Sequence, residues 1–375
     1  MKREFRKKHW PLALGLALPL LLVGLFYLLR DNQAFMSFWV LQLAAPAAQA
    51  LGRLCSIFPF SLFELLFSAA VLVTAILLVR LVLRLIRSRS WRAAIHSLLK
   101  LTAPWLWVLA AFYWLWNAAY YAPTFSQHSG LSDRPHSIQE LAVVTDYFAW
   151  NAARLAPEVP RDEELHWTLT AEDCIRRSLP IYDNIAKEFP CLDMEPVRPK
   201  LFVLSRLQSI LGFTGMYSPF TGEANINGDA PVCLIPSTIS HELSHQRMIS
   251  SEAEANFVGI AACITSDDVV YQYSGYLSGL VYLSNALYAR VPELWYHITR
   301  TRFTPEVRRD WQDNLDYWAQ FDSPVELVAD RAYDAFLKGN GQVLGMESYG
   351  SCIDLLIAYT LPEIMASGQK KSTEG

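Results

Sequence analysis

The sequence predicts an α-helical membrane anchor with three transmembrane helices, followed by a mainly helical, α+β domain. Hydrophobic residues make up 52% of the 375 residues, a high share for a soluble protein. Charge is also placed unevenly. The chain has 32 basic and 36 acidic residues. Residues 1–100 contain 13 of the basic and 3 of the acidic residues, so residues 101–375 contain 19 basic and 33 acidic residues. The first part therefore has a net charge of +10 and the rest −14, which predicts two different environments.

Three stretches are long and apolar enough to cross a bilayer, which needs about 20 residues. Residues 10–29 carry no charge and follow a basic leader at 2–8. A cleaved signal peptide is the competing interpretation, but the stretch is long for one and no clean cleavage site follows. Residues 59–79 are interrupted only by Glu64, which we expect near the interface or against a neighbouring helix. Residues 98–116 contain four tryptophans suited to an aromatic belt.

The basic residues predict the orientation of these helices. Five arginines follow the second stretch, too many for a translocated loop: Arg80, Arg84, Arg87, Arg89 and Arg92. We therefore expect the leader and this loop in the cytoplasm, the loop at 31–58 outside, and everything beyond residue 117 outside as well. Residues 35–54 are apolar enough to lie along the membrane surface.

This topology divides the chain into a membrane domain at 1–116, a linker at 117–136, an outer domain at 137–366 and a disordered tail at 367–375. In the outer domain, Ser137 and Glu140 mark the start of a helix at 138–155, and Pro180 should divide a helix at 170–189. Residues 200–204 read as a strand, and 215–227 as an extended, turn-rich segment. Helices are then expected at 257–264, 269–290, 306–321, 324–338 and 351–360.

The stretch His241-Glu242-Leu243-Ser244-His245 carries the clearest chemical pattern. On a helix, residues four apart share one face, so both imidazoles can bind one metal ion. Glu242 stands beside the first imidazole, placed to take a proton from a water on the metal. Ser237 or Thr238 could cap this helix. The competing interpretation is an amphipathic helix in which two histidines only pack.

A catalytic zinc normally has a third protein ligand, and Glu252 and Glu254 are the nearest candidates. A continuous helix would put Glu252 roughly 16 Å from His241, so the chain must turn within 246–251. Ser251-x-x-Glu254 reads as a capping box, which occupies Glu254 and leaves Glu252 for the metal. Glu254 remains the alternative ligand. The competing interpretation is that both carboxylates are solvated at the start of a helix and bind no metal. Asn256 lies on the face of Glu252 and could support a ligand by hydrogen bonding.

These motifs also resemble those of known proteins. Glu252-x-x-x-Asn256 is similar to the Glu-x-x-x-Asp pattern of gluzincin metallopeptidases, with Asn in place of Asp. Together with residues 219–224, 241–247 and 348–350, it resembles a family of bacterial, membrane-anchored, zincin-like proteins of unknown function. The resemblance implies a zincin-like fold, one Zn²⁺ and a multi-pass location in a bacterial cell membrane. That family often has glycine where this chain has Met248, so the turn must form without it.

The resulting expectation is a membrane-anchored zinc peptidase in which His241, His245 and Glu252 hold the ion and Glu242 is the general base. The alternatives are an inactive zincin-like binding or sensor module and a structural membrane protein. By analogy with zincins, the segment from Met216 to Asn227 could pair with an extended peptide, although an ordinary surface hairpin fits nearly as well.

Partners and lesser candidates complete the expectations. The lipid bilayer and a peptide or protein are the expected partners, and the acidic outer domain argues against nucleic acid. Tyr217 and Tyr349 could stabilise an oxyanion, but neither enters the predicted catalytic set. Four further histidines rank lower: His128, His136, His166 and His297. Six scattered cysteines allow a Cys174–Cys191 disulfide or buried free thiols.

Overall fold

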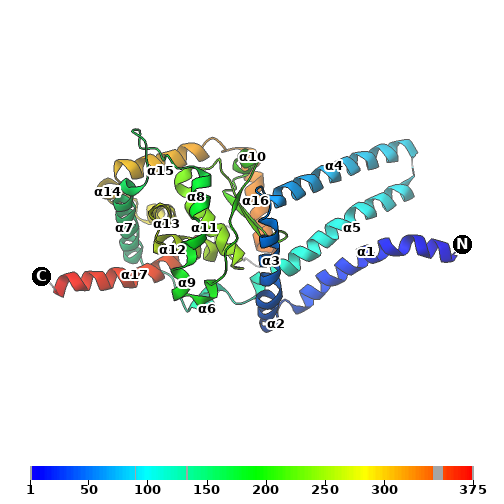
Figure 1. Ribbon diagram of the computed structural model, residues 1–375, viewed down its shortest axis with the longest axis horizontal. Helices are drawn as coiled ribbons and strands as arrows, with labels where there is room; N and C mark the ends of the chain where they lie inside the picture. Colours follow the sequence, from blue (N-terminus) through cyan, green and yellow to red (C-terminus); the bar gives the residue numbers. More distant parts are fainter. Residues whose placement is uncertain (1, 89, 132–133, 341–348, 374–375) are drawn as a thin grey trace. The chain divides into compact units, whose positions relative to one another are not determined.

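The computed structural model describes residues 2–88, 90–131, 134–340 and 349–373. The chain forms two compact units. The N-terminal unit comprises residues 1–122 together with 219–222, and the C-terminal unit comprises 123–218 and 223–375. Figure 1 shows that helices dominate both units and that one small sheet accompanies them.

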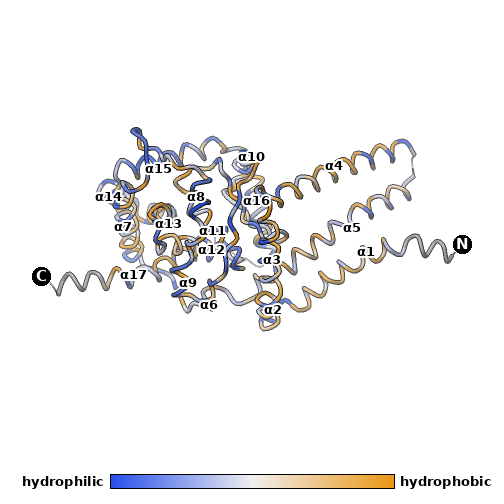
Figure 2. Tube along the Cα trace, viewed as in Figure 1, coloured by the Kyte–Doolittle hydropathy of each residue, from blue (hydrophilic) through white to orange (hydrophobic). Residues whose placement is uncertain are grey.

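The N-terminal unit consists of apolar helices (Figure 2). Its elements are α1 (Lys2–Leu29), α2 (Gln33–Trp39), a π-helical turn (Val40–Ala44), α3 (Ala45–Cys55), α4 (Leu62–Ser88) and α5 (Trp91–Leu115). Among the described residues, four segments are long and apolar enough to cross a membrane: Trp10–Leu29, Gln33–Cys55, Leu62–Arg87 and Trp91–Tyr121. Three of these segments match the predicted spans, which supports membrane association. The structure has four candidate segments, however, where the sequence analysis predicted three transmembrane helices.

The additional candidate is the segment from Gln33 to Cys55, which we predicted to lie along the membrane surface. Its mean hydropathy of 1.3 is the lowest of the four, against 2.5 for Trp10–Leu29 and 2.6 for Leu62–Arg87. In Figure 1, α2 and α3 run across the direction of α1, α4 and α5. Composition alone therefore cannot distinguish a span from a surface helix here, because both need a long apolar stretch.

Tryptophans bind the helices of the N-terminal unit to one another. Trp114 Nε1 on α5 donates to the carbonyl of Leu22 on α1 at 3.0 Å, and Trp39 Nε1 donates to the carbonyl of Trp114 at 2.7 Å. Phe26 is fully buried beside Trp114, with ring centroids 5.8 Å apart. Glu64 is buried in the first turn of α4, at the end of the apolar stretch rather than in its middle.

The sheet of the C-terminal unit has three short strands: β1 (Lys200–Leu201), β2 (Gly215–Ser218) and β3 (Glu223–Ile226). Their order is β1-β3-β2, with β1 parallel and β2 antiparallel to β3. Tyr217 pairs with Ala224, and Met216 with Asn225. The expected strand at 200–204 is thus only two residues long. The extended, turn-rich segment at 215–227 forms a hairpin, and its strand β3 is buried rather than at the surface.

Helices around α11 (Ile235–Gln246), α12 (Glu252–Thr265) and α13 (Val269–Arg290) form the core of this unit. Tyr271 and Tyr273 are fully buried there. The expected helix at 170–189 is divided near Pro180 into α8 (Ala171–Arg177), a 3-10 turn and α9 (Ile185–Glu188). The other helices are α6 (Phe125–Ser129), α7 (Ile138–Leu155), α10 (Ser205–Ile210), α14 (Pro292–Arg302), α15 (Pro305–Trp318), α16 (Pro324–Gly339) and α17 (Tyr349–Thr373).

Two further expectations concern the ends of the C-terminal unit. The predicted linker at 117–136 contains a 3-10 turn and the short helix α6, whose start is closed by a capping box at Thr124. At the other end, α17 continues to Thr373, through residues that we expected to be disordered.

A buried carboxylate connects three parts of the C-terminal unit. Asp310 on α15 pairs with the Arg161 guanidinium through both oxygens, at 2.9 and 2.7 Å. It also accepts hydrogen bonds from Trp167 Nε1 at 3.1 Å and Tyr273 Oη at 2.5 Å. Because both charges are almost fully buried, this pair holds α15 and the 156–170 loop against α13 only while both partners are present.

Candidate metal centre

Helix α11 carries the two histidines on its face toward α12. It begins at Ile235, and Pro236 lies in its first turn, where a missing N–H costs nothing. The predicted cap at Ser237 or Thr238 is wrong, because the helix starts earlier and Ser237 Oγ instead donates to the Leu234 carbonyl at 2.8 Å. His241 and His245 lie one turn apart, with ring centroids 4.7 Å apart.

A tight reversal ends α11 and turns the chain toward Glu252. Ile249 N donates to the Ser244 carbonyl at 3.3 Å, and Met248 N donates to the His245 carbonyl at 3.0 Å. This pair of hydrogen bonds defines a Schellman motif, which needs a left-handed residue after the helix. Met248 supplies it with φ 61°, where glycine is normally favoured. The turn thus forms without the glycine expected from related sequences, at a cost of about 1–2 kcal/mol.

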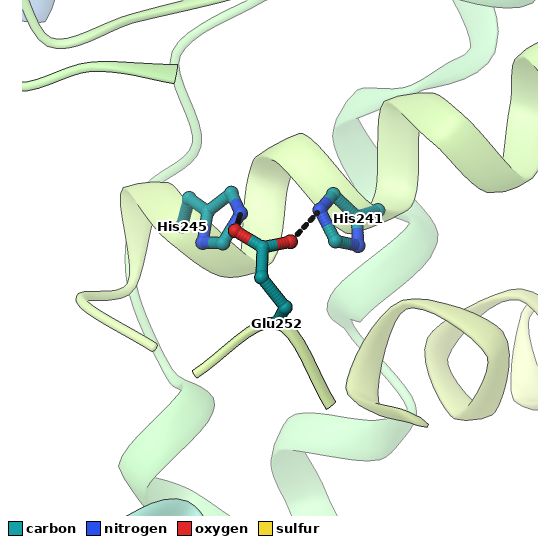
Figure 3. Close-up of side chains that lie close together, drawn as sticks. All are labelled: His241, His245 and Glu252. Atoms are coloured by element: carbon teal, nitrogen blue, oxygen red, sulfur yellow. Dashed lines mark ion pairs between the residues drawn. The ribbon is translucent and has the colours of Figure 1, made fainter. Parts of the chain in front are cut away.

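The reversal brings Glu252, the first residue of α12, to the two imidazoles (Figure 3). Its carboxylate oxygens lie 3.4 Å from His241 Nε2 and 3.7 Å from His245 Nε2. One ligand atom from each of these three residues lies within 4.8 Å of the others. Bonds of about 2.1 Å in a tetrahedral zinc site place ligand atoms about 3.4 Å apart, so the arrangement fits such an ion.

Hydrogen bonding fixes which nitrogen of His245 faces the cluster. His245 Nδ1 lies 2.6 Å from the Ile249 carbonyl, which can only accept, so Nδ1 carries the proton. Nε2 is then the unprotonated nitrogen, and it is the one beside Glu252. Metal-binding histidines are commonly oriented in this way. The Schellman turn therefore both redirects the chain and orients one imidazole.

The charges of the cluster depend on burial and on the neighbouring groups. Burial raises the pKa of the Glu252 carboxyl, but the two imidazoles outweigh it and bring that pKa to about 2. Burial lowers the pKa of His245 to about 4, so its imidazole is neutral, as a metal ligand must be. Burial lowers the pKa of His241 too, yet its hydrogen bond with Glu252 gives a net rise.

Glu242 follows the first histidine on α11 and lies against strand β2, close enough to His241 and Glu252 for their charges to affect its pKa. Its carboxylate packs on Gly215, where an added Cβ would stand 2.6 Å from Glu242 Oε1. Within the described part of the chain, Oε2 is buried without a hydrogen-bond partner. Burial raises the pKa of Glu242 to about 8, and a divalent cation nearby would lower it again by favouring the ionised form. The sequence did not indicate that Gly215 makes room for this side chain.

Glu254 points away from the cluster. Ser251 Oγ accepts from Glu254 N at 3.5 Å, which is one half of the predicted capping box. The other half is missing, because the carboxylate of Glu254 instead accepts from Phe125 N and Ser126 N at 2.9 Å each, and from Ser126 Oγ at 2.7 Å. Glu254 is thus occupied by backbone N–H groups as expected, but they belong to the start of α6.

Two further side chains contact the cluster. A hydrogen bond with the Asn256 side chain contributes to raising the pKa of His241. Tyr333 on α16 donates from its hydroxyl to Glu252 Oε1 at 2.8 Å, and the sequence analysis did not single it out. Tyr333 stands 81 residues from Glu252 in a helix with no motif of its own, so only the fold could identify it.

The remaining candidates lie elsewhere. Tyr217 on β2 is buried with its ring centroid 6.5 Å from that of His245, and burial raises its pKa. The side chain of Tyr349 lies outside the described part of the structure. His136 pairs with Asp354, and His166 with Asp313 at 3.0 Å. His128 and His297 do not belong to the cluster. All six cysteines are free thiols, so Cys174 and Cys191 form no disulfide.

These features define a mainly helical protein with apolar N-terminal helices and a partly buried His-His-Glu cluster suited to a divalent metal. The chain belongs to the family described as "Protein of unknown function (DUF3810)", whose model matches residues 41–357. This agrees with the expectation of a family without a known function. No curated protein and no solved structure matches the chain.

The two neighbouring glutamates should respond differently to substitution. Glu252→Ala should lose bound zinc, because it removes one of the three converging side chains. Glu254→Ala should keep zinc but lose about 2–3 kcal/mol of stability, because it leaves the buried N–H groups of α6 unpaired. Zinc content of the purified variants and their urea unfolding curves measure the two effects. Zinc loss in Glu254→Ala alone would reverse the assignment.

Tyr333→Phe should weaken zinc binding about 10-fold, the lower end of the effect of losing a hydrogen bond to a metal ligand. Competition with a chromophoric chelator measures the affinity. Tyr359→Phe is the matched control, since the Tyr359 hydroxyl also hydrogen-bonds a carboxylate, Glu188, at 2.9 Å but away from the cluster. Equal affinities in both variants would show that Tyr333 does not support Glu252.

Proposed function

We propose that the protein is a membrane-anchored, zinc-dependent peptidase that hydrolyses peptide bonds with Glu242 as general base. The observation that supports this most is the convergence of His241, His245 and Glu252 from two helices. Glu242 is next to His241 in the sequence, and the charges of His241 and Glu252 affect its pKa. The donor set of two imidazoles and one carboxylate is typical of catalytic zinc sites. Zinc bound by these side chains would act as a Lewis acid and lower the pKa of water.

The residues of this chain would then perform the proton transfers. Glu242 accepts a proton from the attacking water at a carboxylate oxygen and delivers it to the nitrogen of the departing amine. Its position is restricted by Gly215 on one side and α11 on the other, so the carboxylate is held in place before substrate arrives. His245 is held by the Ile249 carbonyl, and Glu252 by the Tyr333 hydroxyl.

The alternative is a zincin-like binding or sensor module that keeps the metal without turnover. Glu242 distinguishes the two, because a binding module needs only the three ligands. A buried carboxyl with an oxygen that lacks a partner costs stability and is typical of sites kept for chemistry. If the histidines only packed, no carboxylate would have to be shared between both imidazoles, as Glu252 is. We therefore favour the peptidase.

We also propose that the chain crosses a bacterial cell membrane three times, through α1, α4 and α5, with its N-terminus in the cytoplasm and the C-terminal unit outside. The basic residues support this count. If the segment from Gln33 to Cys55 crossed as well, the loop near Arg87 would be translocated together with its arginines, against the positive-inside rule. Three crossings keep that loop and the basic leader on the same side.

Glu242→Gln should bind zinc like the unaltered protein but hydrolyse peptides 10²–10⁴-fold more slowly, about the effect of losing a general base. The amide keeps the size of the side chain but cannot accept the proton. Cleavage of a diverse peptide library, followed by mass spectrometry, measures turnover, and metal analysis checks zinc. A variant as fast as the unaltered protein would refute the assigned role. An unaltered, zinc-loaded protein that cleaves nothing would favour the binding module.

The topology can be tested with single cysteines in intact cells. Cys191 is the exposed one of the six native cysteines, so Cys191→Ser gives a background with buried thiols only. In that background, His128→Cys should react with a membrane-impermeant maleimide, whereas Arg87→Cys should react only after the cells are opened. Both positions are exposed in the structure. Labelling of Arg87→Cys in intact cells would contradict three crossings.

A further inference from the structure

Helix α16 exposes apolar side chains although several of its polar ones face the protein. Glu326, Asp330 and Tyr333 share one helical face with the buried Leu337 and point toward the protein. Tyr333 bonds Glu252, and a Cβ at Gly212 would meet Asp330 Oδ1 at 3.7 Å and Glu326 Cγ at 3.9 Å. The opposite face carries Val328, Ala332 and Ala335, all exposed. An apolar stripe normally faces the core, so this one requires a different explanation.

Helix α10 adds further apolar side chains next to α16. Leu207 is 46% exposed and Ile210 is 38% exposed, and Val203 and Leu204 just before the helix are exposed as well. The two helices adjoin, because Gly212, which follows α10, lies against Asp330 and Glu326 of α16. The ring centroids of Phe213 and Tyr333 are 5.6 Å apart. We call this combined area the α10–α16 surface: Val203, Leu204, Leu207, Ile210, Leu327, Val328, Ala332 and Ala335.

The connection to the apolar helices limits what can cover this surface. The C-terminal unit begins at Pro123, eight residues after α5 ends at Leu115. Even a fully extended linker of that length spans only roughly 30 Å. A unit tethered so closely to membrane-spanning helices has a bilayer permanently at high effective concentration. A second copy or a soluble partner has to arrive by diffusion.

The charged side chains beside this apolar stripe also bear on contact with the bilayer. Arg331 and Lys338 are both exposed on the flank of α16 that adjoins Val328 and Ala335, and Lys338 Nζ pairs with Asp334 at 2.9 Å. Basic side chains beside an apolar helix face reach lipid headgroups while their methylene stems stay with the apolar residues. Glu326 and Asp330 point away from this face and Lys338 balances the charge of Asp334, which leaves Arg331 to meet the headgroups.

We propose that the α10–α16 surface rests in the interfacial region of the lipid bilayer, with the aliphatic side chains among the upper acyl chains. This contact is separate from the membrane-spanning helices and does not depend on the proposed peptidase activity. It has a consequence for the metal cluster, because the helix that meets lipid on one face holds Glu252 through Tyr333 on the other. Lipid contact would therefore hold α16 in the position in which it supports a metal ligand.

Fluorescence quenching in reconstituted full-length protein tests this proposal. In the Cys191→Ser background, Leu207→Cys and Val328→Cys are each labelled with a bimane fluorophore and placed in phosphatidylcholine vesicles. Some vesicles carry lipids with a nitroxide near the top of the acyl chain. Leu294→Cys on α14 is the matched control, because Leu294 is a comparably exposed leucine, at 39%, on another helix of the same unit. Aqueous iodide serves as the second quencher.

We expect bimane at positions 207 and 328 to lose most of its emission with nitroxide lipid and to be protected from iodide, while position 294 shows the reverse. Two helices are probed, so misfolding of one variant leaves the other informative. Quenching by iodide at 207 and 328 would show a solvent-facing surface and overturn the proposal. Protection from both quenchers would also overturn it, because another polypeptide would then cover the surface.

Discussion

The metal cluster depends on the backbone reversal between α11 and α12. His241 and His245 lie on one helix and Glu252 on the next, and a sharp turn has to bring them together. The Schellman hydrogen bonds and the left-handed Met248 make that turn. The same turn presents the Ile249 carbonyl to His245, so one local structure both brings Glu252 to the cluster and orients the second imidazole. Its strain at Met248 is retained because the helices on both sides are tightly packed.

That packing is close enough to require glycine at particular positions. A Cβ at Gly259 on α12 would stand 2.9 Å from the backbone nitrogen of His241, so the two helices touch backbone to backbone at the first histidine. Gly215 similarly lets β2 approach Glu242. Glu254 then fastens the start of α12 to α6, near the point where the C-terminal unit begins. The cluster is therefore held from several directions, which suits a site that must keep fixed geometry.

The protein combines a polar, partly buried cluster with an unusually apolar exterior. Its N-terminal helices are apolar over most of their lengths, and their charged residues gather toward the helix ends. In the C-terminal unit, α16 shows both tendencies on a single helix, because its polar face serves the cluster and its apolar face is exposed. Burial and charge thus separate the exposed apolar surface from the polar His-His-Glu cluster.

The sequence by itself determined the features that depend on local order and composition. These include the apolar N-terminal helices, the helical spacing of His241 and His245, and the need for a break before Glu252. Periodicity and spacing decide such features, because they act within one or two helical turns. The hairpin at 215–227 followed from its turn residues for the same reason.

Only the tertiary structure decided which groups meet across long stretches of chain. Tyr333 reaches Glu252 from 81 residues away, and Glu254 binds the N–H groups of Phe125 and Ser126 rather than closing its own capping box. No local sequence pattern predicts these contacts. Many tyrosines and many helix starts in the chain could have made them, and only the fold selects the ones that do. The role of the segment from Gln33 to Cys55 was undecided for a related reason: hydropathy measures how apolar a helix is, whereas its direction depends on what it packs against.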